Sequence, residues 1–134
     1  ASSDTTATQR DLVELLFDAL GHFAWLKSEN DMHVATAVSG SGPAYFFAMC
    51  EAMIDVAIEN GLGRDVAETL VHATCAGAGG LIDQTPNAAM LRQRVTSPGG
   101  TTAAGLDALA ENDCLRRVVV GAIDAARKRS IEMS

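Results

Sequence analysis

Apolar residues recur at helical spacing along most of the chain, and polar or glycine-rich breaks separate the periodic stretches. The clearest pattern runs over residues 43–60 and has two apolar stripes. One stripe is Phe46, Phe47, Cys50, Met53, Ile54, Ala57 and Ile58, and the other is Tyr45, Met49, Ala52 and Val56. A helix that is apolar over most of its circumference must be central. In a domain this small, its two apolar sides suggest that another chain covers one of them.

A first helix is expected from a cap at Thr8 to Gly21, where glycine stops the pattern. Its apolar stripe consists of Leu12, Leu16 and Leu20. Residues 22–30 predict a short connector without a partner strand. Asp31 can cap a second, short helix that extends to Val38, with His33 on its outer face.

The segment 39–43 predicts a flexible corner, with Pro43 in the first turn of the helix that follows. Its Gly40-x-Gly42 pattern does not match a dinucleotide fingerprint. Tyr45 stands where the third glycine is needed, and no clear strand precedes the pattern.

Three further helices follow the glycines at positions 61 and 63. The first starts at Arg64 or Asp65, and its predicted buried face is Val66, Leu70, Ala73, Gly77 and Leu81. A short helix over 88–95 is capped by Asn87, and the last helix is capped by Asp113. The apolar face of the last helix is Val118, Val119, Ala122, Ile123 and Ala126. With the helix that opens at Thr101, these elements predict an all-α fold of about six or seven helices without a sheet.

Composition supports this fold class and narrows the partners. At 134 residues the chain is expected to form one domain, 1–134, that buries roughly two thirds of its unfolded surface. Apolar residues make up 48% and aromatic residues 4%, a mixture that favours packed helices over a β-sandwich. The net charge of −7 argues against nucleic acid or an anionic membrane as a partner.

The chain carries no obvious targeting or metal signal. No apolar run approaches the roughly 18 residues that span a bilayer, and no signal peptide precedes the fold. Cys50, Cys75 and Cys114 stand at wide, unpatterned spacing and are interpreted as reduced core residues rather than a disulfide or a metal site. We therefore expect a cytoplasmic protein without a bound metal.

The stretch that carries candidate chemistry is Thr96-Ser97-Pro98-Gly99-Gly100-Thr101-Thr102. Its serine and proline suit a turn, and its two glycines put no side chain between the backbone and a ligand. The helix that opens at the two threonines offers N–H groups without intrahelical partners, and its dipole adds a partial positive charge. Such a site suits a carboxylate or a phosphate. On the residues alone, the alternative is an ordinary Pro-Gly corner between helices.

Other side-chain chemistry is poor. The sequence offers no Ser-His-Asp arrangement and no carboxylate pair whose placement it fixes. A helix-start site orients a substrate, so the reactive group is expected to come from elsewhere.

Two stretches resemble the signatures of the C-terminal domain of pyrroline-5-carboxylate reductase. They are Ala37-Val38-Ser39-Gly40-Ser41-Gly42-Pro43-Ala44-Tyr45 and Val95-Thr96-Ser97-Pro98-Gly99-Gly100-Thr101-Thr102-Ala103-Ala104-Gly105-Leu106. The second is similar to the family's own motif. The spacing between the two also fits, and the resemblance covers the chain from about Asp11 onward.

This resemblance implies the C-terminal part of an oxidoreductase that reduces 1-pyrroline-5-carboxylate to L-proline with NADPH or NADH, the last step of proline biosynthesis. In that family a Rossmann domain binds the dinucleotide, and the helical domain forms an interlocked dimer, often assembled into a decamer. Nothing before Asp11 can form a βαβ unit, so no cofactor-binding residue is expected here. Because the first residue is Ala1 and not Met, a piece of a longer polypeptide is expected. We expect this chain alone to dimerise without turnover.

Carried over by position, the resemblance puts the substrate carboxylate against Ser97 and the backbone of Gly99, Gly100 and Thr101. Thr102 becomes the catalytic residue, since its hydroxyl would reach the imine nitrogen of the ring. In the family's folds the corner at 39–43 lies near the active site, although no contact is assigned to it.

Two other functions stay open. One is a stand-alone helical oligomerisation or regulatory module that has kept the proline pocket as a sensor. The other is the helical half of a related dehydrogenase for a different small acid, although residues 97–102 match the pyrroline-5-carboxylate motif more closely.

Overall fold

The computed structural model describes residues 5–134, and these residues form helices and connecting turns without a strand. The α-helices are α1 (Ala7–Asp18), α2 (Asp31–Ala35), α3 (Gly42–Glu59), α4 (Arg64–Gln84), α5 (Ala88–Arg94), α6 (Thr101–Ala110) and α7 (Cys114–Glu132). A π turn, η1 (Thr36–Gly40), joins α2 to α3, and a 3₁₀ turn, η2 (Glu111–Asp113), precedes α7. The predicted all-α class is confirmed.

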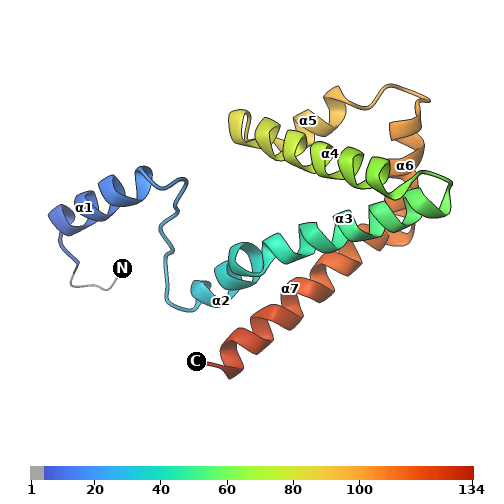
Figure 1. Ribbon diagram of the computed structural model, residues 1–134. Coiled ribbons are helices and arrows are strands. Elements are labelled where there is room, and N and C mark those ends of the chain that lie inside the picture. Colours follow the sequence, from blue (N-terminus) through green and yellow to red (C-terminus); the bar gives the residue numbers. More distant parts are fainter. Residues whose placement is uncertain (1–4) are drawn as a thin grey trace.

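The helices make an open arrangement (Figure 1). Helices α3 and α4 lie side by side as a hairpin, and α7 runs back from α6 to contact α2 and η1. Short α5 contacts α4, and α6 follows it and contacts α7. The chain thus passes through α5 and α6 between the hairpin and the last helix. Helix α1 stands apart from the others at the end of an extended connector.

Very few side chains are fully buried in the described chain. Ile54 of α3 packs with Ala67 and Val71 of α4, and half-buried Cys50, Ala57 and Ile58 extend this cluster. Ala37 in η1 is also buried. The cluster holds α3 against α4, and most of the other large apolar side chains are exposed.

The predicted buried face of α4 is wrong for the single chain. Val66, Leu70 and Leu81 are 52%, 54% and 50% exposed, and Ala67 and Val71 face α3 instead. Apolar residues occur on more than one side of α4, so the periodic pattern alone did not single out the side that faces α3.

The corner at 39–43 is helical, not flexible. The Ser41 amide donates to the Thr36 carbonyl oxygen at 2.9 Å, an i to i+5 bond that makes η1 a π turn. Pro43 stands in the first turn of α3, as predicted. The chain therefore passes from α2 to α3 with helical backbone throughout.

Three cap and surface assignments also change. The cap of α1 is Thr6, not Thr8, because the Thr6 hydroxyl accepts from the Gln9 amide and the Gln9 side chain accepts from the Thr6 amide. Asp113 precedes α7 but makes no side-chain cap bond. His33 does not face outward, because its Nδ1 lies 3.0 Å from the Ser130 hydroxyl on α7.

The apolar face of α7 is only partly as predicted. Ala122, Ile123 and Ala126 are half-buried, whereas Val118 and Val119 are exposed. Cys114 is also exposed at the start of this helix, so the expectation that all three cysteines are core residues is wrong for it.

Candidate functional site

Helix α5 positions the candidate turn. The Asn87 side chain accepts from the Met90 amide at 3.0 Å and so starts α5 where it was predicted. At the other end, the Thr96 hydroxyl donates to the Arg92 carbonyl oxygen at 2.6 Å. These two bonds fix both ends of a seven-residue helix, and the chain leaves it directly into Ser97.

A backbone hydrogen bond closes the turn, and the backbone conformation of the turn depends on glycine. The Gly100 amide donates to the Ser97 carbonyl oxygen at 3.1 Å. Gly99 has a φ of +70°, a left-handed conformation that L side chains rarely adopt.

Gly100 is required for a different reason. A Cβ atom at this position would lie 2.5 Å from the Ser97 hydroxyl oxygen and 3.2 Å from the Ser97 carbonyl oxygen. The serine side chain therefore lies directly against the backbone of the helix cap. This close approach brings a hydroxyl group to the N-terminal end of α6.

Helix α6 begins at Thr101 with Gly100 as its N-cap. The first helical bond of α6 runs from the Ala104 amide to the Gly100 carbonyl oxygen at 3.2 Å, so the amides of residues 101–103 precede the helical ladder. Within residues 5–134, no side chain caps this end of α6. Thr101 and Thr102 are both exposed, so the end of the helix is open to a ligand.

The structure brings all five predicted site residues together in this one turn. Ser97, Gly99, Thr101 and Thr102 are exposed, and Gly100 is half-buried. The arrangement combines three hydroxyl groups, a set of helix-start amides and a partial positive charge from the helix dipole. It can hold a small anion, and none of its hydroxyl or amide groups can donate a hydride.

A cavity of about 350 Å³ lies next to the turn, between α5 and α6. Its lining is Arg92, Gln93, Thr96, Ala103, Leu106 and Asp107. The sequence analysis missed Arg92 and Asp107 as neighbours of the site. The i, i+4 spacing of Arg92 and Thr96 could have placed the arginine on the same face as the start of the turn.

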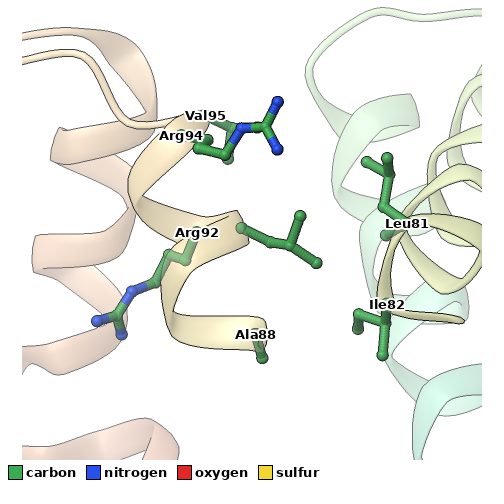
Figure 2. A pocket seen from close by; sticks show the side chains of 8 residues that line it. Leu81, Ile82, Ala88, Arg92, Arg94 and Val95 are labelled. Atoms are coloured by element: carbon green, nitrogen blue, oxygen red, sulfur yellow. The ribbon is translucent and has the colours of Figure 1, made fainter. Parts of the chain in front are cut away.

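A second hollow, of about 490 Å³, separates α5 from the end of α4 (Figure 2). Leu81 and Ile82 extend from α4 toward α5, and Ala88 and Val95 lie on α5. The Arg92 side chain points away from α4 in this view, consistent with its place in the cavity between α5 and α6. This hollow is largely apolar, and Arg92 and Arg94 are the charged residues in its lining.

Two other kinds of site are absent from residues 5–134. Among these residues, no group of three or more His, Cys, Asp or Glu side chains could hold a metal ion. No helix in this range combines the length and the apolar character needed to cross a membrane.

Comparison with known proteins gives one consistent family. The sequence profile of the pyrroline-5-carboxylate reductase dimerisation family matches residues 29–133. The chain is 38% identical over 135 residues to the pyrroline-5-carboxylate reductase of Haemophilus influenzae, and 42% identical over 137 residues to that of Arabidopsis thaliana. Each alignment covers 99% of this chain and 49% of the relative.

Solved structures agree with these relatives. A pyrroline-5-carboxylate reductase from Coxiella burnetii matches with a TM-score of 0.91 and 38% identity, over 100% of this chain and 50% of that one. A pyrroline carboxylate reductase from Plasmodium falciparum, solved with NADP bound, matches with a TM-score of 0.78 and 33% identity. The latter alignment covers 98% of this chain and 50% of that one. The chain thus spans about half the length of the relatives it matches.

Proposed function

Because the chain belongs to the pyrroline-5-carboxylate reductase dimerisation family, we propose that it is the C-terminal part of an enzyme that reduces 1-pyrroline-5-carboxylate to L-proline. Its share of the work is to bind the substrate and to hold the subunits together. The relatives carry the name of this activity and are about twice as long as this chain.

The observation that carries the proposal is the open start of α6. A carboxylate group can accept from the amides of residues 101–103, which no side chain caps in the part of the chain that the structure describes. The Ser97 hydroxyl, held against Gly100, supplies a further donor. The substrate of the proposed reaction has one carboxylate, and this turn binds it without a charged side chain.

The Thr102 hydroxyl is proposed as the catalytic contact. It lies on an exposed position one residue into α6, beside the proposed carboxylate site. From there it can hydrogen-bond the ring nitrogen and hold it as the imine becomes an amine. The chain's contribution is therefore orientation of the ring and stabilisation of the changing charge on nitrogen.

A dinucleotide does not fit the residues that the structure describes. Gly40 stands in the π turn and Gly42 opens α3, so neither belongs to a loop between a strand and a helix. NADPH or NADH, which supplies the hydride in the proposed reaction, is therefore assigned to a part of the polypeptide outside this chain.

The proposed assembly is a homodimer, with a decamer as the larger form. Large apolar side chains on α3 and α4 are exposed in the single chain, including Phe46, Phe47, Met53, Val66 and Leu70. Surfaces of this kind mark interfaces between chains. We also propose a cytoplasmic location, which the three free cysteines support.

The test joins this chain to the N-terminal half of the Haemophilus influenzae relative and measures NADPH oxidation that depends on pyrroline-5-carboxylate. We expect turnover from the fusion and none from this chain alone.

Thr102→Ala should lower kcat by about 100-fold, because the nitrogen loses its hydrogen-bond partner in the transition state. Ser97→Ala should mainly raise KM, by about 5- to 10-fold, because a carboxylate donor is lost.

Thr69→Ala is the matched control, since the Thr69 hydroxyl donates to the Asp65 carbonyl oxygen within α4 and is not part of the turn. It should leave kcat and KM unchanged. A Thr102→Ala effect confined to KM would contradict a role at the imine nitrogen. Proline binding by calorimetry, with a folded but inactive fusion, would favour the sensing module instead.

A further inference from the structure

Two cysteines from different helices meet between α3 and α4. Cys50 lies on α3 and Cys75 on α4, and their side chains are hydrogen-bonded to each other. Both thiols are free and half-buried. The helices that carry them form the most extensive contact between elements in the described chain, and Cys50 packs directly against the buried cluster of Ile54, Ala67 and Val71.

The pair is accessible through a cavity of about 500 Å³ between the two helices. Its lining is Phe47, Cys50, Glu51, Ile54, His72, Cys75 and Ala76. In the single chain, this cavity makes both cysteines accessible without separation of α3 from α4. The third cysteine, Cys114, is exposed at the start of α7 and does not line this cavity.

The two thiols influence each other. The hydrogen bond to Cys75, partial burial and the charge on Cys75 when it is ionised raise the pKa of Cys50. This influence agrees with the position of the two cysteines beside one cavity between the packed helices.

We propose that Cys50 and Cys75 form an oxidisable dithiol that a small-molecule disulfide converts to a covalent clamp between α3 and α4. One of the two thiols loses its proton and attacks one sulfur of the oxidant, and the first small thiolate that leaves takes up this proton. The other thiol then loses its proton and attacks the protein sulfur of the mixed disulfide, which releases the second small thiol. Two protein thiols are oxidised, and one small disulfide is reduced to two thiols.

The clamp should change stability more than shape. The two cysteines stand on helices that already pack against each other and line the same cavity, so we expect the helices to need little movement to form the bond. The bond would close the chain segment between Cys50 and Cys75 in the unfolded state and reduce its freedom. The oxidised form should therefore unfold at a higher temperature than the reduced form.

The experiment treats the full chain with oxidised glutathione, blocks the remaining thiols and maps the peptides by mass spectrometry. We expect the count of free thiols to fall from three to one, with the peptides of Cys50 and Cys75 joined. The unfolding midpoint should rise by about 5 °C, and a dithiol reductant should reverse both changes. Cys114→Ser should give the same joined peptides with no free thiol left.

Cys50→Ser and Cys75→Ser should each abolish the joined peptides and the rise in unfolding midpoint. The inference is overturned if all three thiols survive, if only Cys114 reacts, or if Cys50 or Cys75 holds glutathione without a joined peptide. The peptide map of the unsubstituted chain decides the matter even if a serine variant fails to fold. The outcome is independent of the proposed reductase activity.

Discussion

Gly99 and Gly100 exclude side chains by different physical means. At Gly99 the backbone conformation is the obstacle, because its φ of +70° is costly for any residue with a Cβ atom. At Gly100 the backbone is in an ordinary extended region, and the obstacle is the Ser97 side chain. The two positions therefore make a rigid turn from both conformational and steric requirements.

Gly99→Ala should lower the free energy of unfolding by about 1 kcal/mol, because the left-handed penalty exceeds the entropy that alanine removes from the unfolded chain. Gly105→Ala is the matched control inside α6. Nothing lies within 4 Å of a Cβ at Gly105, so this substitution should raise stability by roughly 0.5–1 kcal/mol. Urea unfolding measures both, and the same sign for the two would contradict the assigned strain.

The turn was predictable at the residue scale, and its surroundings were not. Pro98, the two glycines and the two threonines each have a local preference that sequence alone reveals. The contribution of Arg92 and Asp107 depends on how α5 rotates against α6, which no local pattern encodes. Sequence reasoning thus predicted the turn and its donors but not the cavity beside it.

At the scale of elements, the apolar periodicity predicted well where secondary-structure elements occur and that they are helices. Helix α3 begins one residue before the predicted start at Pro43 and ends one residue before the predicted end at Asn60. The prediction was close because apolar residues nearly encircle this helix and make its pattern strong. Periodicity did not predict which side of α4 faces its own chain, since it reports that a face is apolar but not what covers it. The π turn was missed because a single extra residue in a helix leaves no distinct sequence mark.

Helix α1 is the most independent element. Within its own segment, Trp25 donates to the Glu14 carboxylate at 2.6 Å and lies under the Arg10 guanidinium. Its connector reaches α4 through the ion pair of His22 and Asp83, whose side chains are 91% and 68% exposed. Such an exposed pair stabilises by at most about 1 kcal/mol.

Removal of residues 1–28 should therefore leave the remaining helices folded. The truncated chain is expected to show a higher helical circular dichroism per residue, because α1 is the only helix described before residue 29. It should keep the association state of the full chain, since the family match also starts at residue 29. Asp83→Asn in the full chain is the matched control for loss of the ion pair alone. Aggregation or loss of cooperative unfolding in the truncated chain would show that α1 supports the other helices.

At the scale of the whole molecule, the described chain has too little buried apolar surface to be stable alone. Its fully buried apolar residues are Ala37, Ile54, Ala67 and Val71. Many larger apolar side chains on α3, α4 and α7 are exposed instead. Because burial of apolar surface is the main force in folding, a stable form must cover them with other protein.

Phe46→Glu should break the proposed dimer, because a charge then stands in the middle of a surface that must lose its water. Phe46 is 67% exposed in the single chain, so the substitution costs little there. Sedimentation should show a loss of dimer by at least about 10-fold in affinity, with a lower unfolding midpoint. Phe17→Glu on α1, where the phenylalanine is 51% exposed, is the control and should leave the dimer intact.

The sparse interior has a consequence during synthesis. On the proposed homodimer, a newly made copy completes its folding only when it meets another copy. Until then its exposed apolar helix faces are available to chaperones and proteases. Encounters between copies become rarer as expression falls, and more copies are degraded before they pair. Cellular abundance should then fall more steeply than gene dosage.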